Sequence, residues 1–133
     1  MIYTIINLLI TTKMTEREKY LDDLKILPIG SELIGQYCDY TYSIKRQNIG
    51  HLCGYVILPD GVVIDQSNEN DYNVHGGITY NDGEKIGFDA AHCGDWNDII
   101  TMKGSTYKDV NFMKNEIMKL IDQIEEKKPA IDI

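Results

Sequence analysis

Hydrophobic residues recur at helical spacing near the end of the chain, where the pattern is clearest. Intervals of three and four residues predict one apolar stripe along a long C-terminal helix. Ser105 or Thr106 is the candidate cap of this helix, and Lys127 and Lys128 suit the negative end of its dipole. Such a stripe indicates a core-packing face rather than a cofactor site. It contains Val110, Met113, Ile117, Leu120, Ile121 and Ile124.

A shorter helix is predicted near the N-terminus. Thr15 and Glu18 form a capping box, in which the hydroxyl and the carboxylate satisfy exposed backbone N–H groups. The helix continues through Leu24 and ends before Pro28.

Between the helices, the period of the hydrophobic pattern changes to two, which predicts strands. In CDYTYSI (38–44) the two faces alternate, so a half-buried strand is expected there. After a turn, HLCGYVIL (51–58) predicts a more fully buried strand. Cys38 and Cys53 fall on the apolar faces of these strands and are expected in the core.

Two further apolar segments, VHGGITY (74–80) and KIGFDAA (85–91), flank an Asn-Asp-Gly sequence (81–83) that suits a hairpin turn. In this interpretation His75 lies on the first strand, and Asp89 lies near the end of the second. The predicted fold class is α+β. It consists of an antiparallel sheet of about four or five strands, packed by the long C-terminal helix and the shorter N-terminal helix.

The most hydrophobic stretch is MIYTIINLLITT (1–12). It runs about eleven residues before Lys13, roughly half of the length that a membrane-spanning helix needs. It also lacks the preceding positive charge and the small terminal residues of a signal peptide. A buried strand or a short core segment is therefore expected. An alternative is that Met14 is the functional start, because the helix opens directly behind it.

Length and composition predict one globular domain over residues 1–133. The hydrophobic fraction of 43% and the charged fraction of 26% are ordinary for such a domain. The three cysteines are odd in number and form no CxxC pair. They suit a reducing cytoplasm better than a secreted disulfide scaffold.

The net charge of −8 is concentrated in one part of the chain. Residues 60–98 contain nine acids and one base, Lys85, whereas the rest of the chain has twelve of each. Such a segment repels phosphate groups, so direct nucleic-acid binding is disfavoured. It attracts cations or a basic protein surface. The acids are Asp60, Asp65, Glu69, Asp71, Asp82, Glu84, Asp89, Asp95 and Asp98.

Within this segment, GFDAAHCGDWND (87–98) combines carboxylates with a histidine and a cysteine. Together with His75, the side chains of Asp89, His92 and Asp95 offer two imidazoles and two carboxylates, a set that suits Zn²⁺, Mn²⁺ or Fe²⁺. With a metal bound, the spare carboxylate would act as general base on a coordinated water. Without one, His92 and its carboxylates would serve as an acid–base pair. Nearby residues that permit unusual backbone angles are Gly76, Gly77 and Gly94.

A structural role is the competing interpretation of the same segment. It has neither the HExxH nor the CxxC spacing, and an Asp or Asn beside a Gly often only hydrogen-bonds the backbone of a tight loop. Cys93 is disfavoured as a nucleophile, because its acidic surroundings do not favour a thiolate.

An interaction surface is the third interpretation. Trp96 lies in a polar loop, where it either anchors a protein partner together with Tyr72 or folds back over the hairpin. The candidate contacts of this surface are Asp71, Tyr72, Asp95, Trp96 and Asp98.

Three segments in this order resemble a small protein family found mainly in bacteriophages and mobile elements. They are GHLCGYVILPDG (50–61), VHGGITY (74–80) and IGFDAAHCGD (86–95). The likeness covers roughly residues 37–125 and sets residues 1–36 apart as an N-terminal strand and helix addition. The chain departs from the family after Gly61, where members usually have a histidine, a proline and a basic stretch with Tyr-Asp-Asp. Here VVIDQSNENDYN follows instead.

The resemblance implies a phage setting and names no activity. Small acidic phage proteins of this kind often inhibit bacterial immune systems, some by imitating the charge of DNA. We therefore expect a non-enzymatic, anti-CRISPR-like inhibitor that binds a basic surface of a host protein in the bacterial cytoplasm. No cofactor, nucleic acid or membrane is expected to take part. The residues that match the family's motifs are His75, Gly76, Gly77, Asp89, His92, Gly94 and Asp95.

The alternative is a metal-dependent hydrolase, or a binder of a nucleotide signal, centred on the histidine–carboxylate cluster. A divalent metal would then be its cofactor. The edge strands of a small sheet are also compatible with a homodimer.

Overall fold

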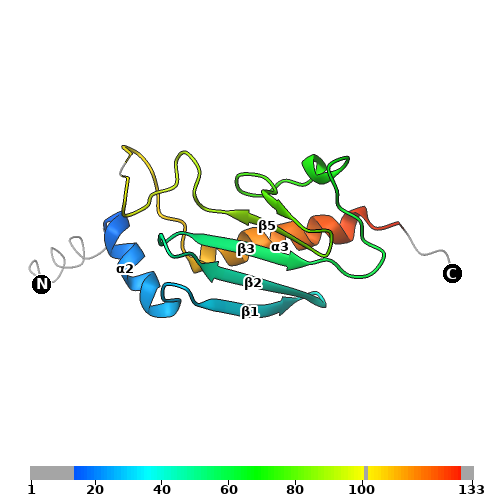
Figure 1. The fold of residues 1–133 in the computed structure, drawn as a ribbon, viewed down its shortest axis with the longest axis horizontal. Coiled ribbons are helices and arrows are strands. Elements are labelled where there is room, and N and C mark those ends of the chain that lie inside the picture. Colours follow the sequence, from blue (N-terminus) through cyan, green and yellow to red (C-terminus); the bar gives the residue numbers. More distant parts are fainter. Residues whose placement is uncertain (1–13, 101, 130–133) are drawn as a thin grey trace, which may run out of the picture.

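The computed structural model describes residues 14–100 and 102–129. The apolar N-terminal stretch, and the strand expected for it, lie outside the described residues. Within them, a five-stranded antiparallel sheet carries a long helix on one face and a shorter helix at one end (Figure 1). The predicted α+β class is confirmed. None of the helices in the described ranges combines the length and the apolar character that crossing a bilayer requires.

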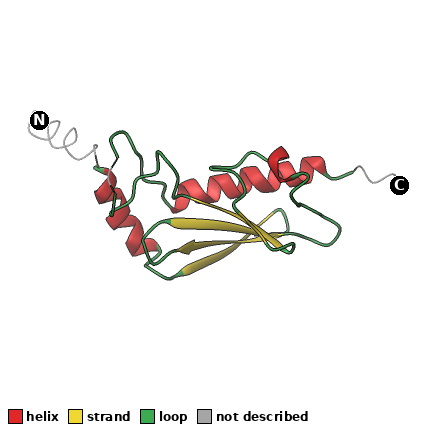
Figure 2. Ribbon diagram, turned by 45° about the horizontal axis from the view of Figure 1, so that its top comes forward, coloured by secondary structure: helices red, strands yellow, loops and turns green. Residues whose placement is uncertain are grey.

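The strands are β1 (Glu32–Tyr37), β2 (Tyr40–Arg46), β3 (Leu52–Ile57), β4 (Tyr80–Asn81) and β5 (Lys85–Asp89). Their order across the sheet is β1-β2-β3-β5-β4, and all neighbours are antiparallel. The helices are α2 (Glu16–Ile26) and α3 (Val110–Lys127), and a short 3-10 helix, η1, covers Glu69–Asp71. α3 runs along one face of the sheet (Figure 2).

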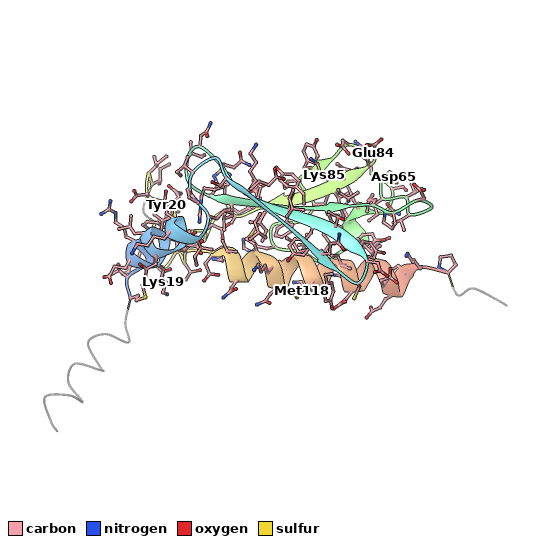
Figure 3. All side chains as sticks on the ribbon, turned by 90° about the horizontal axis from the view of Figure 1, so that it is seen from below. Lys19, Tyr20, Asp65, Glu84, Lys85 and Met118 are labelled. Carbon is pink, nitrogen blue, oxygen red and sulfur yellow. The ribbon has the colours of Figure 1, made fainter. Side chains whose placement is uncertain are left out.

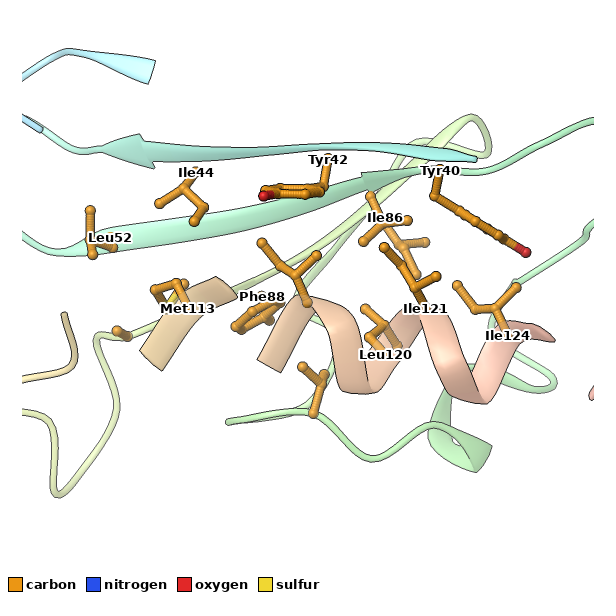
Figure 4. Close-up of a cluster of buried hydrophobic side chains, with 14 of the residues drawn as sticks. Tyr40, Tyr42, Ile44, Leu52, Ile86, Phe88, Met113, Leu120, Ile121 and Ile124 are labelled. Atoms are coloured by element: carbon orange, nitrogen blue, oxygen red, sulfur yellow. The ribbon is translucent and has the colours of Figure 1, made fainter. Parts of the chain in front are cut away.

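α3 is held by the apolar stripe that its sequence predicts. All six stripe residues are buried and pack against the sheet (Figure 4). Asp109 caps the helix, because its Oδ1 accepts a hydrogen bond of 2.7 Å from Phe112 N. The predicted caps, Ser105 and Thr106, are wrong, since both belong to the loop ahead of Asp109. Sheet residues that face the stripe include Tyr40, Tyr42, Ile44, Leu52, Val56, Ile86 and Phe88.

The turn between β1 and β2 departs from the predicted pattern. Cys38 and Asp39 both have positive φ, 49° and 66°, and they form a two-residue turn. Residues 38–44 are therefore not one continuous strand, and Cys38 is exposed, which corrects its assignment to the core. Cys53 is buried, but it shares a sheet face with its β2 partner, the exposed Lys45, rather than with α3.

The hairpin around residues 81–83 is confirmed, but its first strand, β4, has only two residues. VHGG forms a tight turn instead of a strand, in which Gly77 N donates to Val74 O at 2.8 Å. Gly76 and Gly77 have φ of 71° and 79°, and two such residues cannot continue an extended strand. His75 therefore lies in a turn, which corrects its predicted place on a strand.

The segment between β3 and β4 runs back along α3 (Figure 2). Asn73 and Gln123 exchange two hydrogen bonds of 2.7 Å, and His75 N donates to Glu116 Oε1 at 2.8 Å. Because Gln123 and Glu116 lie about two turns apart on α3, the segment follows the helix towards its N-terminal half. This path brings His75 close to the loop that follows β5.

α2 attaches to the end of the sheet largely through polar contacts. Thr15 caps it as predicted, with Oγ1 accepting a hydrogen bond of 3.1 Å from Glu18 N. Of its residues, only Tyr20 and Asp23 are buried. Asp23 pairs with Arg46, the last residue of β2, whose side chain has no exposed surface.

Candidate functional site

Asp95 is the centre of the segment that the sequence singles out. It lies in the loop between β5 and α3, and its side chain is almost completely buried. His75 Nε2 is 2.9 Å from both carboxylate oxygens, His92 N donates to Oδ2 at 2.9 Å, and Lys108 Nζ is 3.2 Å from Oδ1. Both oxygens are thus engaged by groups of the protein itself.

These partners fix the charge of Asp95. Burial alone would raise the pKa of the carboxyl group, because burial penalises the charged form. Hydrogen bonds from His75, from His92 N and from Lys108 outweigh that penalty and lower the pKa below its ordinary value. The carboxylate is therefore ionised at neutral pH and pairs with the Lys108 ammonium group.

His92 and Asp89 form a second, looser pair beside it. His92 Nε2 lies 3.1 Å from Asp89 Oδ1, but the contact lacks hydrogen-bond geometry, and Nε2 has no hydrogen-bond partner among the described residues. Asp89 instead accepts hydrogen bonds from Thr79 Oγ1 at 2.9 Å and from Ala91 N at 3.0 Å. The rings of His75 and His92 are 6.1 Å apart. The four predicted side chains are thus neighbours, arranged as two His–Asp pairs.

This arrangement does not fit a metal centre. A protein site for a transition metal supplies three or more ligands around one point. No group of three His, Cys, Asp or Glu side chains is arranged in this way in the part of the chain that the structure describes. His75 Nε2 and the oxygens of Asp95 are directed at each other. The geometry favours the structural interpretation, in which the cluster ties the VHGG turn to the loop after β5.

Gly76 is the point at which the VHGG turn and the loop after β5 pack against each other. The His92 ring packs directly over it, so that a Cβ on Gly76 would lie 2.3 Å from His92 Nε2 and Cδ2. Gly77 and Gly94 also have positive φ, of 79° and 93°, but open space surrounds the position of their missing Cβ. Close packing therefore requires a glycine at position 76, whereas at the other two positions only the backbone conformation favours one.

Replacing Gly76 with alanine should lower the free energy of unfolding by about 2–3 kcal/mol. The alanine must adopt the left-handed backbone conformation of Gly76, and its Cβ must displace the His92 ring. Gly77→Ala is the matched control, because it meets the same backbone strain without the contact, and it should cost about 1 kcal/mol. Urea unfolding of both variants measures the difference. Equal losses would show that the contact with His92 contributes nothing.

Two further side chains near the cluster were not evident from the sequence. Lys108, which pairs with Asp95, comes from the stretch just before α3. His51 precedes β3 and is half-buried; burial lowers the pKa of its imidazole, although the charges of Asp89 and Asp95 act in the opposite direction. The register that places Cys53 opposite Asp89 brings His51 towards the cluster. No local sequence motif predicts that either side chain lies near the cluster, because only tertiary packing brings them there.

Trp96 is buried against the rings of Tyr20 and Tyr107, with centroid distances of 5.6 and 6.2 Å. It joins α2 to the loop before α3, so it neither reaches solvent as an anchor nor folds over the hairpin. Asp98 is exposed and pairs with Arg17 at 3.0 Å. Of the five predicted partner contacts, Asp95 and Trp96 thus lie away from the exposed surface.

The structure divides the acidic segment 60–98 between two ends of the molecule. Asp89, Asp95 and Asp98 lie towards α2, each beside a histidine or a base. The other six acids lie towards the opposite end, on the loop after β3 and on the β4–β5 turn, where Figure 3 shows Asp65 and Glu84. We call these six residues the acidic end: Asp60, Asp65, Glu69, Asp71, Asp82 and Glu84.

Asn81 joins the two loops of the acidic end. Its Nδ2 donates to Ile64 O at 2.8 Å and lies 3.5 Å from Glu69 Oε2. An open groove of about 370 Å³ lies between the loops, and Asp65, Glu69 and Tyr80 are among its lining residues. The lining contains two carboxylates and no base. Its chemistry suits a positively charged side chain.

Comparison of the chain with protein-family models, with curated proteins and with solved structures finds no match in any of the three. The likeness of residues 37–125 to a phage family therefore stays a prediction.

Proposed function

We propose that the protein is a non-enzymatic interaction protein whose acidic end binds a basic surface of a partner protein. The observation that carries this proposal is the convergence of six carboxylates from two separate loops on one end of the sheet. Complementary charge on two surfaces steers their encounter and selects among partners. The acidic end and its groove supply the negative side of such a pair.

Several of these carboxylates are available to a partner. Asp65 and Asp82 accept hydrogen bonds within their own turns, from Ser67 and from Lys85 N respectively, and these bonds lower the pKa of each carboxyl group. Glu69 accepts the long hydrogen bond from Asn81 Nδ2 at 3.5 Å. By contrast, no side-chain hydrogen bond within the described residues engages the other three acids, which are exposed. These three are Asp60, Asp71 and Glu84.

The bases near the acidic end are directed at aromatic rings. Lys85, the one base of residues 60–98, has its Nζ 4.9 Å from the Tyr55 ring centroid and 5.5 Å from that of Tyr80. Lys127 Nζ lies 5.4 Å from the centroid of Tyr72. These ammonium groups make cation–π contacts, so they neutralise the acidic end less than direct ion pairs would.

The proposed setting rests on the resemblance of residues 37–125 to the phage family. We propose a bacteriophage or mobile-element protein that acts in the cytoplasm of a host bacterium. There it would inhibit a defence complex by occupying a basic surface of that complex. The negative charge that favours this partner also opposes direct binding of nucleic acid.

The test is a triple charge reversal, Asp60→Lys with Asp71→Lys and Glu84→Lys, in a tagged chain that captures proteins from host lysate. Because these side chains form no turn contacts among the described residues, the fold should survive. Recovery of a stoichiometric partner should fall at least about tenfold, since each substitution replaces an attraction by a repulsion. Added salt should weaken capture by the wild type, because it screens the same charges.

The matched control reverses three acids away from the acidic end, on α2, on β1 and beside α2. It makes the same change in net charge and should leave capture intact. Equal losses in both triple variants would assign the effect to net charge alone. Unchanged capture by the acidic-end variant, or no partner for the wild type, would refute the proposal. The control residues are Asp22, Glu32 and Asp98. Asp22 and Asp98 make only exposed ion pairs, with Lys25 and Arg17, and the loss of such pairs costs little stability.

A further inference from the structure

An apolar patch lies at the α2 end of the molecule, opposite the acidic end. Ile99 and Ile100 are 67% and 64% exposed, although they are consecutive in the chain. Consecutive exposed apolar residues destabilise a water-facing surface unless another group covers them. The apolar patch consists of Leu21, Ile49, Ile99, Ile100 and Met102, all of which are exposed.

Hydrogen bonds fix the exposure of the two isoleucines. Asn97 Oδ1 accepts hydrogen bonds from Ile99 N at 2.9 Å and from Ile100 N at 2.7 Å. This turn fixes the backbone from which the two exposed side chains project. A fixed apolar surface is better suited to binding a segment than a loosely held loop, because less conformational entropy is lost.

The patch is continuous with the start of α2. Arg17 Nε is 3.0 Å from Asp98 Oδ1, and this contact ties the loop after Trp96 to the first turn of the helix. The ribbon of that loop accordingly passes beside the start of α2 (Figure 1). Leu21 follows Arg17 by one helical turn, and Ile49 lines the same small cavity as Asp98. The apolar side chains therefore lie beside the first half of α2.

We propose that residues 1–13 of the same chain cover the apolar patch. Eight of the first twelve residues are large and apolar, and the first charged residue is Lys13. The described chain begins at Met14, next to the helix cap Thr15 and close to Arg17. Thirteen residues span at most about 45 Å when extended. Both the length and the attachment point suit a segment that folds back over the patch.

Tethering favours this occupant over a second copy of the chain. Covalent attachment through a short stretch of chain gives the segment an effective concentration of about 1 mM, far above the concentration of separate chains in dilute solution. The apolar run is also only about half as long as a membrane-spanning helix. Docking within one chain therefore satisfies both apolar surfaces without another molecule.

A double-mutant cycle in the full chain tests the proposal. The segment variant is Ile6→Ser with Leu9→Ser, and the patch variant is Ile99→Ser with Ile100→Ser. Each pair should lower Tm by about 5 °C, because each removes apolar contact between the same two surfaces. All four substitutions together should lower Tm by no more than either pair alone, because the contact can be lost only once.

Ile34→Ser is the matched control, since Ile34 is exposed on β1, remote from the patch. It should leave Tm unchanged and show no coupling to the segment variant. An unchanged Tm in the patch variant, or additive losses in the cycle, would overturn the proposal. So would a light-scattering mass that falls from dimer to monomer in the segment variant, which would identify a second copy. Sedimentation of the wild type alone with phosphatidylglycerol–phosphatidylethanolamine vesicles would identify a lipid surface instead.

Discussion

Replacing Arg46 with methionine should lower the free energy of unfolding by about 4 kcal/mol, the largest loss that we expect from a single substitution. The Arg46 side chain has no exposed surface, and its Nη2 is 2.9 Å from Asp23 Oδ2. Methionine retains much of the length of the side chain but leaves the Asp23 carboxylate buried without its cation. The uncompensated buried charge, more than the lost attraction, causes the loss.

Arg46 also donates hydrogen bonds that methionine cannot replace. Its Nε donates to Leu27 O at 3.0 Å, and its Nη1 donates to Gly50 O at 3.1 Å and to the Tyr107 hydroxyl at 2.6 Å. The same hydroxyl donates to Asp23, and burial raises the pKa of Tyr107 far above its ordinary value. The guanidinium group thus joins α2, the end of β2 and the loop before α3, so its removal weakens several junctions together.

Urea unfolding at pH 7, followed by the fluorescence of Trp96, measures this loss. The indole packs on Tyr20 and Tyr107 beside the network, so it reports on this junction. Lys45→Met is the matched control, because it removes the neighbouring, exposed cation of β2. It should change the free energy of unfolding by less than about 0.5 kcal/mol. A loss at Arg46 as small as that at Lys45 would show that α2 is held by its apolar contacts alone.

The same residue shows how far sequence pattern predicts this fold. α3, β2 and β3 are predictable because their apolar residues follow the period of their own element. Arg46 continues the buried, alternate positions of β2, but a charged residue there gives no sign of burial. Its partner Asp23 is 23 residues away, and only the packing of α2 brings them together. The pattern does not predict β1, because its residues are half-buried or exposed and give a weak alternation.

The candidate site shows a similar limit. The hairpin interpretation predicts that His75 and Asp89 approach each other, because it places them on adjacent strands. The structure instead pairs His75 with Asp95 and leaves Asp89 beside His92. The sequence does not reveal that His75 and Asp95 are directed at each other instead of at a shared ligand. The number of acids in residues 60–98 also does not show that this segment extends over the length of the sheet. Their carboxylates therefore separate into two groups, one at the α2 end beside histidines or bases and one at the acidic end.

Replacing Asp95 with asparagine should lower the free energy of unfolding at pH 7 by about 3 kcal/mol. The side chain is 1% exposed and receives hydrogen bonds or an ion pair from three groups. Asparagine has nearly the same shape, but it has no negative charge to pair with the Lys108 ammonium group. Its NH₂ group also replaces one carboxylate oxygen, so a hydrogen-bond donor would face the donors that surround Asp95. Urea unfolding measures the loss, and Asp98→Asn, at an exposed carboxylate, is the control that should show little change.

The loss at Asp95 should also depend on pH in a defined direction. Burial alone would raise the pKa of this carboxyl group, but its hydrogen bonds outweigh burial and hold the pKa below the ordinary value. The stabilisation is therefore complete above the unfolded pKa of about 3.9 and is lost as the pH falls through the lower folded value. Wild type and Asp95→Asn should differ fully at pH 7 and converge below about pH 4. A difference that persists unchanged into acid would show that shape, not charge, makes Asp95 necessary, and that the carboxylate does not hold the VHGG turn in place.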